Sequence, residues 1–203
     1  MNGCIFIETR ERTGLSEIFE RHLQYVPDLY PMAVCSKFNE HQFKDYDKII
    51  IDHPANISVY NYMLTSCNFW GKIPFDKVLI CEHDSGILRE GIEEFEQWDY
   101  VGAPWWFQSW GGNGGFSWRS VEVMKTICQV VKYNPSMGQE DLFFCNEMQK
   151  SDQFKMAPHL VCSKFSVETV FNMGTFGYHF GGDAKRLLSK NQISKIKNQY
   201  AKV

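Results

Sequence analysis

Three residues with side chains able to bind a metal ion follow a short apolar run. Residues 78–81 (Val-Leu-Ile-Cys) have the length and composition of a strand buried on both faces. The run is followed by Glu82, His83 and Asp84. Glu82 and Asp84 are two residues apart, so both project to the same side of an extended strand. Two carboxylates on one side suit a hard divalent cation such as Mn²⁺ or Mg²⁺. The alternative interpretation is a strand end with ordinary polar turn residues.

A second pair of carboxylates, Glu140 and Asp141, stands just before the apolar run 142–145. Acidic residues at a helix start also complement the helix dipole, which is the simpler interpretation. In a catalytic interpretation, one carboxylate accepts a proton from an incoming hydroxyl group and the other hydrogen-bonds the substrate. His179, between two aromatic residues, is either a packed core histidine or a third metal ligand if the fold brings it to Asp84.

Residues 111–115 (Gly-Gly-Asn-Gly-Gly) are the most unusual local segment. Glycines permit positive φ angles and close approach of the backbone to a ligand. Asn113 offers both a donor and an acceptor to sugar hydroxyls, whereas the alternative is a flexible hairpin tip. The run lacks the Lys-Ser/Thr ending of a P-loop and the spacing of a dinucleotide fingerprint. Trp105, Trp106 and Trp110 precede it, as core residues or as the stacking wall of a sugar subsite.

The segments expected to position these residues show two alternating patterns of apolar residues, one typical of strands and one typical of helices. Short apolar runs at 4–7, 32–35, 48–51 and 78–81 are typical of strands, and helical spacing is present over 15–26 and 57–67. This alternation predicts an α/β fold with a mostly parallel central sheet and helices on both faces. The second half has a strand-like stretch at 98–104 and a helical pattern over 124–131.

Length, charge and cysteine content limit the class of protein. The chain has 203 residues, a formal net charge of −3 and seven scattered cysteines. The charge argues against nucleic-acid binding, and cysteines without a Cys-x-x-Cys pair indicate a reducing compartment, so a cytoplasmic location is expected. Apolar runs are too short to span a membrane. We expect one domain over 1–182, followed by a basic segment at 183–203 that forms a surface helix or a linker to a further domain.

Several motifs in a definite order resemble those of a known group of enzymes. The motifs are the strand end 80–84, Tyr-Val-Gly-Ala-Pro-Trp at 100–105, Gly-Asn-Gly-Gly-Phe-Ser-Trp-Arg at 112–119, Glu-Asp-Leu-Phe-Phe at 140–144, Phe-Ser-Val-Glu at 165–168 and Gly-Tyr-His at 177–179. Together they resemble a family of GT-A-type glycosyltransferases that includes virus-encoded members. The resemblance implies a GT-A-like domain that binds a nucleotide sugar, with a metal ion held by an Asp-x-Asp motif.

The resemblance also implies roles for individual residues. Asp84 matches the last Asp of the motif, Glu82 stands at the position of its first Asp, and His179 matches a metal-binding histidine. Glu140 and Asp141 match the pair that includes the catalytic base. The residues expected to bind the donor are Glu8, Thr9, Arg10, His83, Asn113, Gly114 and Trp105.

The implied reaction is metal-dependent transfer of a sugar from a nucleoside-diphosphate sugar, with UDP as the expected nucleotide, to a glycan or another hydroxyl acceptor. Mn²⁺ or Mg²⁺ is the expected cofactor. In an inverting enzyme Asp141 would be the base, and in a retaining enzyme it would orient the sugar. The alternatives are a non-catalytic nucleotide-sugar or glycan-binding module and a metal-dependent phosphoesterase. A phosphoesterase is disfavoured because the chain lacks the dense Asp/His set of two-metal sites.

Overall fold

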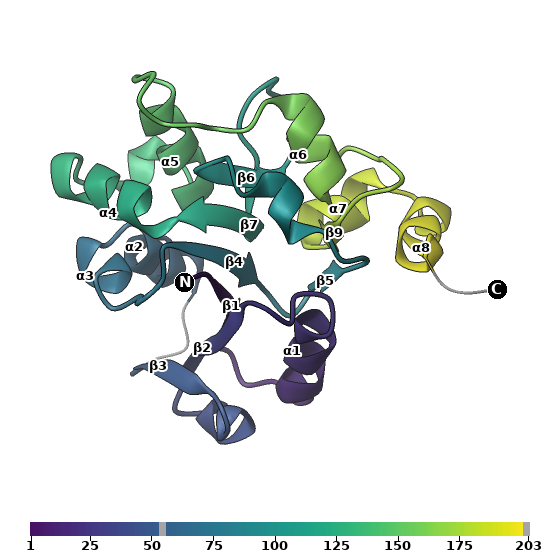
Figure 1. The fold of residues 1–203 in the computed structure, drawn as a ribbon, viewed down its shortest axis with the longest axis horizontal. Helices are drawn as coiled ribbons and strands as arrows, with labels where there is room; N and C mark the ends of the chain where they lie inside the picture. The colour runs from purple at the N-terminus through teal and green to yellow at the C-terminus, as the bar shows by residue number, and fades with distance from the viewer. Residues whose placement is uncertain (53–55, 201–203) are drawn as a thin grey trace.

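A six-stranded sheet forms the centre of the computed structural model, which describes residues 1–52 and 56–200 (Figure 1). Its strand order is β3-β2-β1-β4-β7-β6. The strands are β1 (Gly3–Ile7), β2 (Tyr30–Ser36), β3 (Asp47–Ile51), β4 (Lys77–Cys81), β6 (Tyr100–Ala103) and β7 (Asn113–Ser120). Strands β1 to β4 pair in parallel, while β7 runs antiparallel to β4 and to β6. The predicted mostly parallel sheet is confirmed.

Helices cover both faces of this sheet because side chains alternate along the buried strands. Ile5 and Ile80 belong to a core shared with α2 to α5, whereas Phe6 and Leu79 belong to a second core shared with α1 and α6. The helices are α1 (Leu15–Leu23), α2 (Ile57–Leu64), α3 (Cys67–Trp70), α4 (Val121–Val130), α5 (Glu140–Met148) and α6 (His159–Phe165). The 3₁₀ turns are η1 (Glu40–Phe43), η2 (Ile92–Phe95) and η3 (Pro135–Met137). The predicted α/β fold with helices on both faces is therefore confirmed.

The glycine-rich segment differs from a hairpin tip, because β7 begins within it at Asn113. Within 111–115 the positive φ angle is at Gly111, at 72°. The other glycines serve close packing: a Cβ on Gly102 of β6 would lie 2.2 Å from the carbonyl oxygen of Asn113. A Cβ on Gly112 would likewise lie 2.6 Å from the carbonyl carbon of Gly102, so β6 and the start of β7 approach closely because neither glycine has a side chain.

A small second sheet brings distant residues to the end of β4. It has the order β5-β9-β8, with β5 (Ser85–Ile87), β8 (Ser166–Val167) and β9 (Gly177–His179). The antiparallel register pairs Ser85 with His179, and the N–H of Phe180 donates to the carbonyl oxygen of Asp84 at 2.9 Å. This pairing places His179 beside Asp84.

The basic C-terminal segment forms two short helices, α7 (Gly182–Leu187) and α8 (Lys190–Asn198). Ala184, Leu188 and Ile196 of this segment join a small core with Val167 and Phe180. The segment therefore packs against the second sheet, as Figure 1 shows for α7. Among the described residues, every helix is too short or too polar to span a lipid bilayer.

Candidate metal centre

Glu82, Asp84 and His179 form a compact cluster of possible metal ligands. One ligand atom from each lies within 4.8 Å of the others. His179 Nε2 is 3.2 Å from Asp84 Oδ1 and 3.6 Å from Glu82 Oε2. Two carboxylates and one imidazole are ligands that Mn²⁺ accepts, and the carboxylates also suit Mg²⁺. The fold thus brings together the three residues that the sequence suggests as ligands.

Three polar atoms of this cluster are buried and form no hydrogen bond of normal geometry, although they lie at ion-pair distance from one another or from Glu168. They are Asp84 Oδ1 and both ring nitrogens of His179, a side chain that is only 8% exposed. Buried polar atoms without partners are costly and therefore uncommon. Coordination of a cation by Asp84 Oδ1 and His179 Nε2 would compensate for their lost hydration, so the residues fit a divalent metal ion.

The carboxylates around His179 stabilise a positive charge on or beside its ring. Burial alone would lower the pKa of His179, but its contacts with Asp84, Glu168 and Glu82 raise that pKa well above its ordinary value. Burial alone would raise the pKa of Asp84, but His179 and His83 hold that pKa below its ordinary value. Glu168 Oε1 lies 3.5 Å from His179 Nδ1, on the far side of the ring from Asp84. A carboxylate behind a ligating imidazole orients the ring and increases its basicity.

Tyr60 of α2 fixes the carboxylate of Glu82. Its hydroxyl group donates to Glu82 Oε1 at 2.5 Å. Burial raises the pKa of Tyr60 well above its ordinary value, and the charge of Glu82 adds to this effect. Tyr60 therefore keeps its proton and leaves Glu82 Oε2 facing His179.

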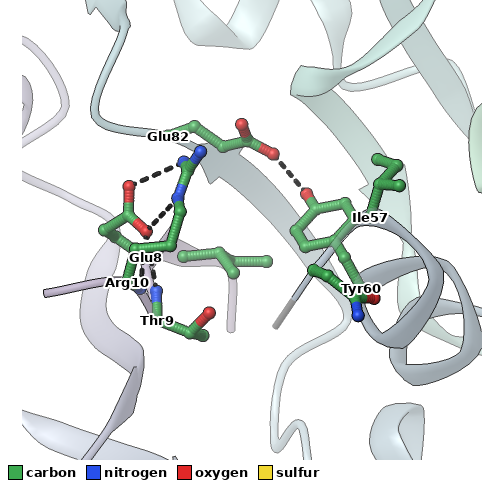
Figure 2. Close-up of a pocket in the computed structure, with 8 residues that line it drawn as sticks. Glu8, Thr9, Arg10, Ile57, Tyr60 and Glu82 are labelled. Carbon is green, nitrogen blue, oxygen red and sulfur yellow. Dashed lines mark hydrogen bonds and ion pairs between the residues drawn. The ribbon is translucent and has the colours of Figure 1, made fainter. Parts of the chain in front are cut away.

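A pocket of about 150 Å³ adjoins this cluster, and Figure 2 shows Tyr60 and Ile57 opposite Glu8 and Arg10. Its lining residues are Ile7, Glu8, Thr9, Arg10, Asn56, Ile57, Tyr60 and Glu82. Arg10 donates through Nε to Glu8 Oε1 and through Nη2 to Glu8 Oε2, both at 2.8 Å. His83 Nδ1 lies 2.9 Å from Glu8 Oε2.

Glu8 is held as an ionised carboxylate in this pocket. Burial alone would raise its pKa, but hydrogen bonds from His83 and Arg10 lower the pKa to about 2.

Four of the predicted donor-binding residues, Glu8, Thr9, Arg10 and His83, lie together at this pocket. They meet because β1 and β4 are parallel neighbours whose carboxyl ends share one edge of the sheet.

Two glycines of β7 pass directly over the site. A Cβ on Gly115 would lie 2.6 Å from His179 Nε2, and a Cβ on Gly114 would lie 2.0 Å from Glu140 Oε1. The amide oxygen of Asn113 accepts from the N–H of Gly115 at 2.9 Å. Gly114 and Gly115 thus leave the space that the metal cluster and the acidic pair of α5 occupy.

Asp141 is buried at the start of α5 and contacts β7. Its Oδ2 accepts from the N–H of Gly114 at 3.1 Å, and its Oδ1 accepts from the N–H of Leu142 at 2.8 Å. Burial and the nearby charge of Glu140 raise the pKa of Asp141 to about 7, although these hydrogen bonds and Arg119 oppose the shift. A carboxylate with a pKa near neutrality is suited to general base catalysis.

Glu140 forms a buried ion pair with Arg119. Arg119 donates through Nη1 to Glu140 Oε2 at 2.6 Å and through Nη2 to Glu140 Oε1 at 2.8 Å. Arg119 Nη2 also donates to the carbonyl oxygen of Gly114 at 3.1 Å. Both oxygens of Glu140 are therefore engaged within the protein, and the pair ties β7 to the start of α5. The carboxylate of Asp141 instead meets two neutral backbone N–H groups, whereas that of Glu140 is paired with a guanidinium.

We expect Arg119→Met to lower the free energy of unfolding by about 3–5 kcal/mol, because the carboxylate of Glu140 would stay buried without its partner. Urea denaturation measures this change. The matched control is Lys150→Met, which removes an ion pair to Glu147 whose lysine side chain is 66% exposed and should cost less than about 1 kcal/mol. The double variant Arg119→Met/Glu140→Leu should regain part of the loss. Equal effects of Arg119→Met and Lys150→Met would contradict the assigned role.

Trp105 lies apart from the pocket of Glu8. It is buried, stacks on Phe107 with ring centroids 5.6 Å apart and meets Trp110 edge-on. It lines a separate hollow with Trp106 and Phe107.

Sequence patterns assign no individual role to three residues that shape the site: Tyr60, Arg119 and Glu168. Arg119 and Glu168 end two of the motifs described above, whereas Tyr60 reads as an ordinary helix residue.

Comparisons with known proteins agree with the topology. Residues 41–179 match the model of a family described as "Protein of unknown function (DUF5672)". No curated protein matches the sequence. Among solved structures, the galactosyltransferase LgtC, determined with donor and acceptor sugar analogs, matches with a TM-score of 0.55 and 10% identity over 100% of this chain and 97% of that chain. At this identity the likeness concerns the fold. The protein thus has a GT-A-like fold and belongs to the DUF5672 family.

Proposed function

We propose that the protein is a metal-dependent glycosyltransferase that uses a nucleoside-diphosphate sugar, with UDP as the expected nucleotide. The observation that carries this proposal is the cluster of Glu82, Asp84 and His179, whose possible ligand atoms lie within 4.8 Å of one another beside the pocket of Glu8. The GT-A-like fold, shared with a galactosyltransferase crystallised with donor and acceptor analogs, supports it. The acceptor is a glycan or another hydroxyl compound.

Asp84 and His179, with Glu82, would hold Mn²⁺ or Mg²⁺. The bound cation would supply positive charge to the diphosphate leaving group. Tyr60 fixes one oxygen of Glu82, and Glu168 orients His179, so these ligands are held in place by neighbouring side chains. Preorganised groups avoid the cost of rearrangement during the reaction.

The pocket of Glu8 is the proposed site of the nucleoside. Ile7, Ile57 and Tyr60 provide apolar surface for a flat base. Glu8, ionised and fixed by Arg10, would accept hydrogen bonds from the base or ribose. Thr9, Asn113 and Gly114 are proposed to complete the donor contacts.

Asp141 is the proposed acid–base residue of the transfer step. The acceptor oxygen forms a bond to the anomeric carbon of the sugar, the bond from that carbon to the diphosphate oxygen breaks, and the hydroxyl proton passes to Asp141. The transition state has oxocarbenium character, as in glycoside hydrolysis. This role applies to transfer with inversion; with retention, Asp141 would instead orient the sugar.

We expect UDP to stabilise the protein strongly in the presence of Mn²⁺ and weakly in its absence. A ligand at a concentration of 100 Kd that binds only the native state adds about 2.7 kcal/mol, which corresponds to roughly 5–10 °C in Tm for a chain of this size. Differential scanning fluorimetry with UDP, GDP, ADP and CMP, each with Mn²⁺ or EDTA, measures the shift. An equal shift in EDTA would contradict the metal assignment. Release of UDP from a UDP-sugar then distinguishes a transferase from a binding module.

A further inference from the structure

A second hollow, separate from the pocket of Glu8, lies at the loop between β6 and β7. It is open and shallow, with a volume of about 620 Å³. We refer to it as the aromatic hollow, and its lining residues are Trp105, Trp106, Phe107, Gln108, Ser109, His159 and Val170. The proposed donor and metal sites leave these side chains without a role.

Large aromatic rings of this hollow face solvent. Trp106 is 62% exposed and Phe107 is 51% exposed, while Trp105 is buried beneath them. The planes of Trp105 and Phe107 are inclined by only 20°, and Trp106 meets Phe107 edge-on at 5.7 Å between centroids. Adjacent exposed aromatic side chains keep apolar surface in water, which is characteristic of binding sites. The flat rings favour a ligand that has an apolar face.

The polar side chains of the hollow include an amide, a hydroxyl group and an imidazole. Gln108, Ser109 and His159 surround the rings, and the described lining residues include no carboxylate, lysine or arginine. Gln108 Nε2 is buried and has no hydrogen-bond partner in the described structure. A buried donor without a partner favours a ligand that brings an acceptor, such as a hydroxyl group. A neutral sugar combines such hydroxyl groups with an apolar ring face.

A different hollow, between α1 and the second sheet, shows the contrast. It contains Arg21, Lys185 and Lys197 among its lining residues, which suits an anion. The aromatic hollow has no such charges, so charge complementarity favours a neutral ligand there.

The aromatic hollow adjoins the proposed catalytic residues at two points. A Cβ on Gly111 would lie 2.7 Å from the ring of Trp105 and 3.0 Å from Cys145 Sγ, so this glycine packs between Trp105 and α5, the helix whose first turn contains Asp141. On the other side, Val170 follows closely after Glu168, whose carboxylate contacts His179. The strand registers place the loop between β6 and β7 at the edge of the sheet where β4 ends, so a ligand bound in the hollow would lie on the same side of the domain as the proposed transfer site.

We propose that the aromatic hollow binds a neutral sugar residue of the acceptor, so that the acceptor of this enzyme is a glycan. The faces of Trp106 and Phe107 stack on the pyranose ring, and Gln108 Nε2 donates to one of its hydroxyl oxygens. This inference rests on the proposed function, because only a transferase needs a second sugar site beside the donor.

The test uses lactose, maltose and cellobiose as probes, titrated into the full chain and followed by protein-detected NMR. We expect Trp106→Ala and Phe107→Ala each to weaken binding of the disaccharide that binds best by about tenfold or more. Trp106→Leu should show the same loss, because it keeps an apolar side chain without a flat face. Phe38→Ala is the matched control, since Phe38 is also 51% exposed but does not line the hollow. It should leave binding unchanged.

Two outcomes would overturn the inference. One is that none of the three disaccharides binds, or that the variants bind them as well as the native chain does. The other is that the native chain forms a dimer by sedimentation velocity and Trp106→Ala abolishes it, which would make the hollow an interface between copies of the chain. The Mn²⁺-dependent stabilisation by UDP is measured on the same variants and should be unchanged. Its absence from the native chain would contradict the proposed donor site alone, while sugar binding that depends on Trp106 would stand.

Discussion

Asp84→Asn is expected to lower metal-dependent sugar transfer by roughly 10²-fold or more and to remove most of the Mn²⁺-dependent stabilisation by UDP. Asp84 Oδ1 is buried without a hydrogen bond at 3.2 Å from His179 Nε2, so it is placed to share a cation with that ring. Asparagine keeps the shape of the side chain but removes the negative charge that attracts the cation. Release of UDP measures turnover, and calorimetric titration with Mn²⁺ measures metal affinity.

The fold of the Asp84→Asn variant should be intact, because the substitution removes a buried charge rather than packing. Its Tm without ligand should fall somewhat, because the carboxylate of Asp84 loses its favourable contacts with His179 and His83, but the variant should still unfold in a single cooperative transition. Asp152→Asn is the matched control, since Asp152 is exposed, and it should alter neither turnover nor Mn²⁺ affinity. Unchanged Mn²⁺ affinity in Asp84→Asn would exclude Asp84 as a ligand.

Asp141→Asn is expected to lower the rate of transfer by about 10²- to 10⁴-fold, the usual contribution of a general base. The amide can still accept the N–H of Gly114 through its oxygen, but it cannot accept a proton from the acceptor hydroxyl. Donor affinity should change little, because it depends on the metal cluster and the pocket of Glu8. Calorimetry measures donor affinity, and product formation measures transfer.

The pH dependence gives an independent test of Asp141. Because its pKa is about 7, transfer by the native chain should rise with pH up to about 7 and then level off. Loss of donor binding in Asp141→Asn, with the pH profile unchanged, would instead make Asp141 a residue that orients the sugar.

The ionisation of Asp141 should also change the stability of the protein, but in the opposite direction: activity rises with pH, whereas the free energy of unfolding falls. The pKa of Asp141 is raised in the folded state from a value near 4 in an unfolded chain. The native state therefore keeps the proton at pH values where the unfolded chain releases it, and the free energy of unfolding falls as the pH rises from about 4 to about 7. Asp141→Asn lacks this loss, so the stability of the variant relative to the native chain should increase over that range.

The sequence by itself determined the parts of the fold that depend on local patterns. Apolar runs such as 78–81 predict buried strands, and their alternation with helical spacing predicts the parallel sheet that the structure confirms. It also placed Glu8 and Glu82 at strand ends. Parallel strands that are neighbours bring their carboxyl ends to one edge, so their proximity follows once β1 and β4 pair.

Only the tertiary structure decided which distant residues meet. His179 reaches Asp84 because β9 pairs with β5 in a register that sets Ser85 opposite His179, and the local pattern around His179 is equally consistent with a core histidine. Arg119 and Glu140 form their ion pair because β7 is inserted antiparallel beside β4, against α5. That packing also explains why residues 114 and 115 are glycines, because a Cβ at either position would clash with Glu140 or His179. Such contacts depend on strand order and register, which short-range periodicity does not encode.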